Sequence, residues 1–454
     1  MSGPRAVRRI GVFGHVGNGN LGDEAIISVV IQNIKRRYPS AEVYGFTVNP
    51  EDTRERHNIT AFPIRRIDRT QEGATPDNRG QFGTQENKWS SKLLRQVKIR
   101  LKTVPLVYRF LKKIQKIWHV LGASLKEPGF LLQSYRNLKG VDLLIIAGSQ
   151  QLIDYVAGGP WGHPYTLFKW VLLAKARKTR IAFMSVGAGP IQSVLGRFFI
   201  RNCLFLANYR SCRDEVSRKC IEQLGVLGHN PVFPDLAYSL CVKERVPDAH
   251  SSIAQPVVGI NPLPFLDPQY WVGGSARNYE IYIREIANFA LWLIQRGYSV
   301  LFFPTQLRAD PPVIEDIRIH MNKSSTLDIE KHINDYPIHT FDDLTSAISM
   351  ADMIIATRFH GVIFSYLLNK PVLGIAYGNK TNDLMEQMGQ TEYALDILQC
   401  ELKSLQERFI SLESRQTAIK RTIAQRILAH RQALDVQYDQ VFRLLETDRE
   451  KGWS

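Results

Sequence analysis

The segment RIGVFGHVGNGNLGDEAI, from Arg9 to Ile26, decides how the chain begins to fold. Its apolar run predicts a buried strand over residues 7–14, and the amphipathic pattern after the glycines predicts a helix over 22–37. A second apolar stretch predicts another strand over 41–48. A strand, a helix and a strand in this order form a βαβ unit, which is the building block of a parallel sheet.

The same alternation recurs in two further stretches of the chain. In the first of these stretches, VDLLIIAG and RIAFMSVGAG predict buried strands. In the second stretch, buried strands are predicted by VVGINP, SVLFFP, MIIAT and PVLGIAY. A polar, proline-bearing linker, CVKERVPDAHSSIAQP, separates them. We therefore predict an α/β protein with Rossmann-like, parallel-sheet domains over 1–245 and 246–400 and a helical tail over 401–454. Two such domains facing a cleft form a GT-B-like arrangement, with chemistry at the carboxyl ends of the strands.

The composition fits this organisation. The chain has 454 residues, of which 44% are hydrophobic, and this is enough for two cores of ordinary size. Its five cysteines are scattered and form no C-x-x-C pair, so neither a disulfide framework nor a metal site is predicted. The N-terminal apolar run is too short for a signal peptide, and no run reaches the roughly 18 residues of a membrane span. We therefore expect a cytoplasmic protein.

Positive charge is concentrated in one part of the first domain. Between Lys88 and Lys139 there are thirteen Lys or Arg residues and one acid, so this segment carries most of the formal net charge of +15. The polar stretch 70–90 predicts a surface loop, and 91–139 predicts a basic helical insertion. One interpretation is peripheral contact with anionic lipid at the inner membrane face. The other is a solvated or partner-binding basic face, and such local charge makes nucleic acid the less favoured partner.

The glycine loop resembles a cofactor fingerprint. Gly17, Gly19 and Gly22 match the pattern G-x-G-x-x-G of dinucleotide-binding sites. However, Asp23 and Glu24 follow at once, and two carboxylates in the first helical turn would repel a bound pyrophosphate. An NAD-dependent dehydrogenase is therefore disfavoured.

Two other interpretations of the loop fit its residues. Asn20 with Asp23 three residues later matches a capping-box-like helix start, and the glycines would then permit close packing. Alternatively, the loop presents Asn20 and Asp23 to the hydroxyl groups of a polar substrate. Both interpretations can hold together.

The stretch ATRFHGVIFSYLLNKPVLGIAYGNK carries the sharpest chemical signal. A buried strand ends at Thr357, a loop carries Arg358 and His360, and a helix begins near Gly361. Backbone N–H groups at such a helix start attract anions, and an arginine adds a fork that suits phosphate or carboxylate. His360 should resist protonation there and stay available for proton transfer. Lys380 follows the next strand and can return to the same rim.

The first domain offers possible partners at its own strand ends. Arg213 stands at a strand-to-helix turn in SCRDEV, where it pairs either with a local carboxylate or with a ligand. Asp235 in PDLAYSL is a strand-end acid that either caps the next helix or joins the site. Ser185, Gly187 and Gly189 form another glycine-bearing loop, which would allow a ligand to approach the backbone closely.

Taken together, these motifs resemble the polysaccharide pyruvyltransferase family. The resemblance spans about residues 8–390 and rests on NLGDEAI, SVGAGPI, SCRD, PDLAYSL and RFHGVIFSYLLNKPVLGIAYGNK. It implies transfer of a pyruvyl group from phosphoenolpyruvate to two hydroxyls of a saccharide or lipid-linked saccharide, with phosphate release. One departure concerns Ala147–Gln151, where AGSQQ stands in place of the family's triple glycine.

The resemblance also implies roles for single residues. His360 becomes the acid/base group, Arg213, Arg358 and Lys380 bind phosphoenolpyruvate, and no cofactor or metal is needed. We keep three alternatives: a GT-B glycosyltransferase that uses a nucleotide sugar, the disfavoured dehydrogenase, and a non-catalytic module that binds nucleic acid through 88–139.

Overall fold

The computed structural model describes residues 7–14, 17–66, 127–155, 158–242, 255–271 and 273–446. The predicted loop 70–90 and the larger part of the predicted insertion 91–139 lie outside these residues. Of the insertion, residues 127–137 form a helix.

The first domain is built on a six-stranded parallel sheet, with strand order β3-β2-β1-β4-β5-β6. The strands are β1 (Arg9–Phe13), β2 (Glu42–Thr47), β3 (Thr60–Pro63), β4 (Leu143–Ala147), β5 (Arg180–Val186) and β6 (Tyr209–Cys212). The connecting helices are α1 (Leu21–Arg37), α2 (Pro50–His57), α5 (His163–Ala176), α6 (Val194–Leu206) and α7 (Glu215–Gln223). The order reverses between β1 and β4, which is where doubly wound sheets bind ligands.

The second domain is built on a five-stranded parallel sheet, with strand order β11-β10-β9-β7-β8. Its strands are β7 (Val257–Asn261), β8 (Ser299–Phe302), β9 (Met353–Ala356), β10 (Val372–Ala376) and β11 (Ala394–Asp396). Its helices are α8 (Ala276–Gln295), α9 (Asp310–Ser324), α10 (Phe341–Met350), α11 (Phe359–Leu367) and α12 (Asn379–Gln387). The predicted fold class, with two parallel α/β domains, is confirmed.

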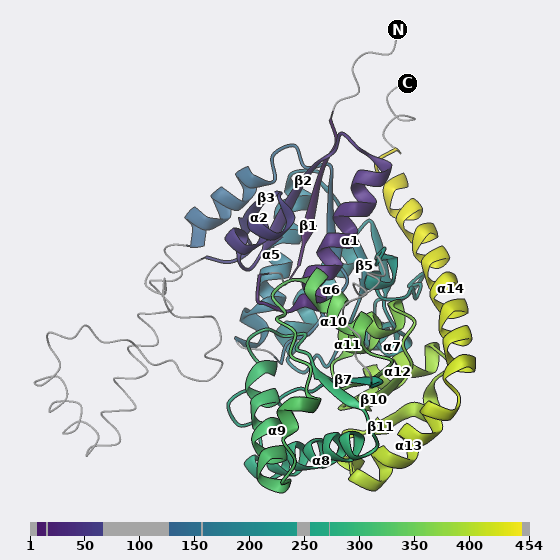
Figure 1. Cartoon of the computed structure of the whole chain (residues 1–454). Coiled ribbons are helices and arrows are strands. Elements are labelled where there is room, and N and C mark those ends of the chain that lie inside the picture. The colour runs from purple at the N-terminus through teal and green to yellow at the C-terminus, as the bar shows by residue number, and fades with distance from the viewer. Residues whose placement is uncertain are drawn as a thin grey trace, which may run out of the picture.

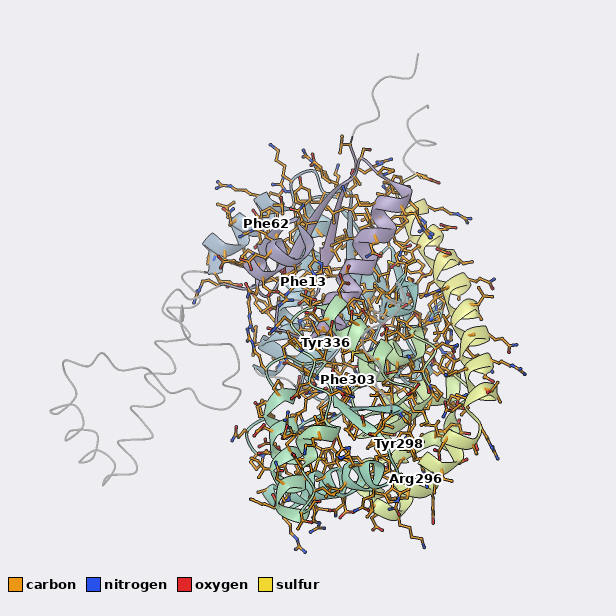
Figure 2. All side chains as sticks on the ribbon, viewed as in Figure 1. Phe13, Phe62, Arg296, Tyr298, Phe303 and Tyr336 are labelled. Carbon is orange, nitrogen blue, oxygen red and sulfur yellow. The ribbon has the colours of Figure 1, made fainter. Side chains whose placement is uncertain are left out.

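Apolar periodicity explains these elements. Every residue of β4, β7 and β9 is buried, as expected for strands that are covered on both faces. Phe13 and Phe303 are fully buried in the first and second domains, and Figure 2 shows them on either side of the domain junction. Asn20 starts α1 by accepting a hydrogen bond from the Gly22 N–H at 3.0 Å, so the Asn20 part of the predicted cap is present. Asp23, predicted to complete a capping box, instead accepts from the Ser149 hydroxyl.

The tail is a helical pair, α13 (Leu402–Ser414) and α14 (Gln416–Arg443). Figure 1 shows α14 (yellow) running back along the second domain to the first. There, Tyr438 is fully buried, and the Gln437 amide donates to the hydroxyls of Ser185 and Ser211 at 3.0 and 2.7 Å. Helix α14 therefore completes the core of the first domain.

Candidate active site

The glycine loop forms one of the contacts between the two domains. The Leu21 N–H donates to the Thr305 carbonyl, and the Leu307 N–H donates to the Gly19 carbonyl, both at 2.9 Å. A Cβ atom at Gly22 would lie only 2.0 Å from Nδ1 of His360. Glycine is therefore required where the first turn of α1 packs against the imidazole of the opposite domain.

His360 lies in the first turn of α11, which begins at Phe359, two residues before the predicted start, and it faces the first domain. Its ring stacks against Phe364 with 5.8 Å between centroids. Nε2 is shielded from solvent and has no hydrogen-bond partner among the described residues. Burial lowers the pKa of His360 to about 4; Asp235 opposes this shift, and the Arg213 and Lys380 cations add to it. The imidazole is therefore neutral near pH 7.

Arg213 reaches across the junction from the first domain. It follows β6 and is buried, with its guanidinium carbon 4.4 Å from the ring centroid of Phe359 in the second domain. It donates to the carboxylates of Asp214 and Asp235, both at 3.4 Å. Gln150 accepts a further hydrogen bond from Nη2 at 3.2 Å. The arginine thus pairs with local carboxylates and also borders His360.

Lys380 lies in the first turn of α12, directly after β10. Burial lowers its pKa to about 8, and Arg213 lowers it further, while Asp214 and Asp23 oppose the shift. Because β9 and β10 are neighbouring parallel strands, the loops that carry His360 and Lys380 leave the same sheet edge. The two residues are close enough for their charges to interact.

Arg358 stands apart from this group. Its Nε donates to Oδ1 of Asp310 at 2.9 Å, and Nη2 donates to the same oxygen. Asp310 is fully buried, and its other oxygen accepts from the N–H groups of Thr305 and Gln306. Arg358 therefore ties the loop before His360 to the segment that contacts the glycine loop.

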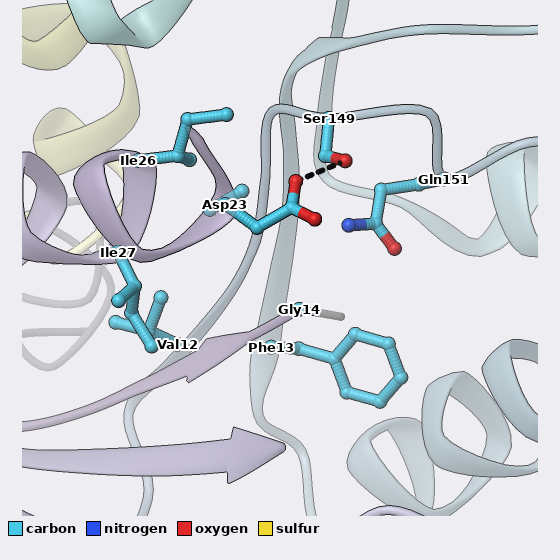
Figure 3. Close-up of a pocket in the computed structure, with 9 residues that line it drawn as sticks. Val12, Phe13, Gly14, Asp23, Ile26, Ile27, Ser149 and Gln151 are labelled. Carbon is cyan, nitrogen blue, oxygen red and sulfur yellow. Dashed lines mark hydrogen bonds between the residues drawn. The ribbon is translucent and has the colours of Figure 1, made fainter. Parts of the chain in front are cut away.

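Asp23 lies across the junction from Lys380, in the first turn of α1. The Ser149 hydroxyl donates to its Oδ1 at 2.8 Å (Figure 3). Burial raises the pKa of Asp23 to about 7; the Ser149 hydrogen bond and Arg213 oppose this rise, and Glu24 and Asp235 add to it. Asp23 can therefore exchange a proton near neutral pH.

The AGSQQ loop, Ala147–Gln151, lines a small pocket. The pocket leaves about 10 Å³ for the centre of a water-sized group and is lined by Val12, Phe13, Gly14, Asp23, Ile26, Ile27, Ala147, Ser149 and Gln151. In Figure 3 the Gln151 side chain lies beside Asp23. The Gln151 side chain is buried, and neither its Oε1 nor its Nε2 has a partner in the part of the chain that the structure describes.

Gln150 and Gln151 are site residues that the sequence analysis missed. Gln150 accepts from Arg213, and its Nε2 donates to the Gly189 carbonyl at 2.6 Å. Their position in the fold could have indicated them, because their loop follows β4 at the point where the strand order reverses, and ligands bind at this point in such sheets.

The glycine-bearing loop after β5 serves this arrangement. A Cβ at Gly187 would lie 2.8 Å from Oε1 of Gln150 and 3.0 Å from Nη2 of Arg213. The sequence predicts that a ligand can approach the backbone closely at this loop. In the structure, the side chains of Gln150 and Arg213 make this close approach to Gly187. Ser185 is fully buried and hydrogen-bonded to Gln437 in the tail, so it supports the loop from behind.

The site thus combines two cations, a neutral imidazole and a carboxyl group that titrates near pH 7, drawn from both domains. Among the described residues, no three His, Cys, Asp or Glu side chains are grouped so that they could hold a metal ion. Within the same residues, no helix has the length and hydropathy needed to cross a membrane.

Two parallel-sheet α/β domains with a polar site at their junction define a GT-B-like protein. Solved structures with this fold include the UDP-GlcNAc 2-epimerase from Neisseria meningitidis bound to UDP-GlcNAc, with a TM-score of 0.53 at 11% identity, over 96% of this chain and 100% of that one. The UDP-GlcNAc 2-epimerase from Methanocaldococcus jannaschii has a TM-score of 0.51 at 8% identity, over 88% of this chain and 92% of that one.

The chain belongs to the polysaccharide pyruvyl transferase family, whose model matches residues 20–379. A curated relative is the amylovoran biosynthesis protein AmsJ from Erwinia amylovora. It is 25% identical over 402 residues, which cover 84% of this chain and 87% of AmsJ.

Proposed function

We propose that the protein transfers a pyruvyl group from phosphoenolpyruvate to two hydroxyls of a saccharide in polysaccharide biosynthesis, forming a cyclic ketal and releasing phosphate. One observation carries the proposal: Arg213 and Lys380, from opposite domains, lie close enough to His360 for their charges to lower its pKa, and its Nε2 has no partner among the described residues. Membership of the polysaccharide pyruvyl transferase family supports pyruvyl transfer, and the relation to AmsJ, an amylovoran biosynthesis protein, supports a role in polysaccharide biosynthesis.

The donor fits the charges at the junction. Phosphoenolpyruvate carries a phosphate and a carboxylate, and Arg213 and Lys380 can offset these charges in a site of low dielectric. Arg358 is the third proposed donor-binding residue, two positions from His360. Its tie to Asp310 holds the loop that carries the imidazole in place.

The reaction needs two proton transfers. One sugar oxygen bonds to C2 of phosphoenolpyruvate while the methylene carbon takes a proton and becomes a methyl group. The second sugar oxygen then bonds to C2 as the C–O bond to phosphate breaks. The two hydroxyls lose one proton each; one ends on carbon and the other leaves with phosphate.

His360 is the proposed proton carrier. In the free protein its lowered pKa makes it a weak base. A bound donor brings negative charge next to the ring, and this raises the pKa of an imidazole and strengthens it as a proton acceptor. The site is therefore activated by its own substrate.

The acceptor side is proposed at Asn20 and Asp23, with Gln151 added by the structure. The Gln151 amide offers a donor and an acceptor in a pocket that has room for about one hydroxyl-sized group. Asp23, with a pKa of about 7, is placed to exchange the second proton.

The first test replaces the imidazole. His360→Ala should fold normally and lose phosphate release from phosphoenolpyruvate in the presence of acceptor, by about 10²- to 10⁴-fold, the range of general acid–base catalysis. His430→Ala is the matched control, because His430 is also half-buried with a pKa lowered to about 4 but lies on α14. Undiminished turnover in His360→Ala would overturn the assignment.

The second test separates the proposal from the nucleotide-sugar alternative. In calorimetric titration the protein should bind phosphoenolpyruvate, and Arg213→Met should bind it more weakly. Binding of a nucleotide sugar without binding of phosphoenolpyruvate would instead support a GT-B glycosyltransferase. Mass spectrometry of the acceptor should detect the added pyruvyl ketal.

A further inference from the structure

The outward side of α6 is apolar and basic. Val194, Phe198, Arg201 and Phe205 follow one another at positions i, i+4, i+7 and i+11, so they form one stripe along the helix. The stripe faces solvent, with 84% of Val194 and 53% of Phe198 exposed. The opposite side packs inward through Phe199, Ile200, Cys203 and Leu204. The helix is therefore apolar on both sides.

Neighbouring residues widen this stripe into a surface. Trp161 is 62% exposed, and its ring makes an edge contact with Phe199 at 5.6 Å between centroids. Phe168 of α5 contacts Phe198 in the same way at 6.0 Å. Eight exposed residues make up this surface, which we call the α6 face: Trp161, Leu172, Val194, Leu195, Arg197, Phe198, Arg201 and Phe205.

The charged residues of the α6 face are Arg197 and Arg201, both exposed, so the face itself is positively charged. The guanidinium carbon of Arg201 lies 5.2 Å from the ring centroid of Phe205, so charge and aromatic surface are interleaved. A water-facing helix ordinarily carries mixed charges on this side.

We propose that the α6 face docks on an anionic lipid surface. Interfacial helices place Phe, Trp and Leu at the acyl boundary and Arg or Lys among the headgroups, and the α6 face supplies both. Arginine can keep its charge at the phosphates while its methylenes lie on apolar groups. Pairing of two copies of α6 about a two-fold axis is disfavoured, because it would bring arginines of the two copies together.

The start of α6 is hydrogen-bonded to the segment that follows the candidate acceptor pocket. Ser193 caps α6, and its hydroxyl and N–H both donate to the Asp154 carboxylate at 2.6 Å. Asp154 stands three residues after Gln151. Docking would therefore bring a lipid-linked saccharide to the acceptor side of the junction. The delivery of a lipid-linked saccharide rests on the proposed function, whereas the binding of the α6 face to lipid does not.

Vesicle co-sedimentation of the full chain tests the proposal. Wild-type protein should bind phosphatidylglycerol-containing vesicles more tightly than pure phosphatidylcholine vesicles. Val194→Asp with Phe198→Asp should weaken binding at least tenfold. Arg197→Ala with Arg201→Ala should weaken binding to the anionic vesicles by about 25-fold, since each Arg near such a surface contributes about 1 kcal/mol, a factor of about five.

The matched control carries the same changes on another exposed helix. Leu428 and Val436 of α14 are exposed to similar extents, and Leu428→Asp with Val436→Asp should leave vesicle binding unchanged. All variants should turn over a water-soluble acceptor at the wild-type rate, so failure of lipid binding is distinguishable from failure of the proposed reaction.

Two results would overturn the proposal. Unchanged vesicle binding by both α6 variants would assign any lipid contact to another part of the chain, such as 88–139. A lowered melting temperature of Val194→Asp with Phe198→Asp, without weaker vesicle binding, would show that protein and not lipid covers this face.

Discussion

Replacing Gln151 by Met tests whether its buried amide binds substrate. The amide is 1% exposed and makes no hydrogen bond to any residue that the structure describes. A buried polar group without a partner destabilises the folded state, whereas an apolar group of similar shape does not. A residue that lowers the stability of the free protein is typical of a functional site, where its polar group binds the substrate.

The expected changes in stability and in acceptor KM follow from the two Gln151 atoms without a hydrogen-bond partner, Oε1 and Nε2. A buried unsatisfied group costs about 1–3 kcal/mol, so Gln151→Met should raise the free energy of unfolding by about this amount. For a chain of 454 residues, the melting temperature should rise by about 1 °C for each kcal/mol. Loss of two neutral hydrogen bonds to the acceptor, at about 0.5–1.5 kcal/mol each, should raise the acceptor KM about tenfold.

Calorimetry and steady-state kinetics together give the result. Gln150→Met is the matched control, because that amide is used by Arg213 and Gly189 and its loss should lower the melting temperature. If Gln151→Met melts below the wild type, or keeps the wild-type acceptor KM, the amide has a structural role and the acceptor assignment fails.

Two further predictions concern the same junction. Gly22→Ala would place a methyl group 2.0 Å from Nδ1 of His360; it should lower the free energy of unfolding by about 1–3 kcal/mol and abolish phosphate release, and wild-type behaviour would contradict the packing described. The pH profile of kcat/KM should have a narrow maximum between about pH 7 and pH 8, because Asp23 gains its negative charge above about 7 and Lys380 loses its positive charge above about 8. Asp23→Asn should remove the acid limb and Lys380→Arg the alkaline limb; a profile that neither variant changes would refute these roles.

Much of the fold could be predicted because its signals are local. The apolar run near residue 10 and the periodic pattern after it correspond to β1 and α1. The strand ends that carry His360 and Lys380 could also be located, since parallel strands bring their carboxyl ends to one edge. Each of these inferences needs only a short stretch of sequence.

The partners within the site depend on contacts between distant segments and could not be predicted. Nothing near Gly22 indicates that His360 packs against it, and nothing near Arg358 indicates Asp310. In the AGSQQ loop, the Ser149 hydroxyl donates to Asp23 and the Gln150 side chain accepts from Arg213, and neither contact has a local sequence signal.

The return of α14 to the first domain has a consequence during synthesis. Ser185 and Ser211 belong to strands made early, but the Gln437 amide that satisfies them belongs to the last helix. Leu434, Tyr438 and Phe442 join the same apolar cluster as α1. During synthesis, the first domain therefore cannot bury all of its apolar core before α14 has been made. We expect the packing of α14 onto this domain to be a late step of folding.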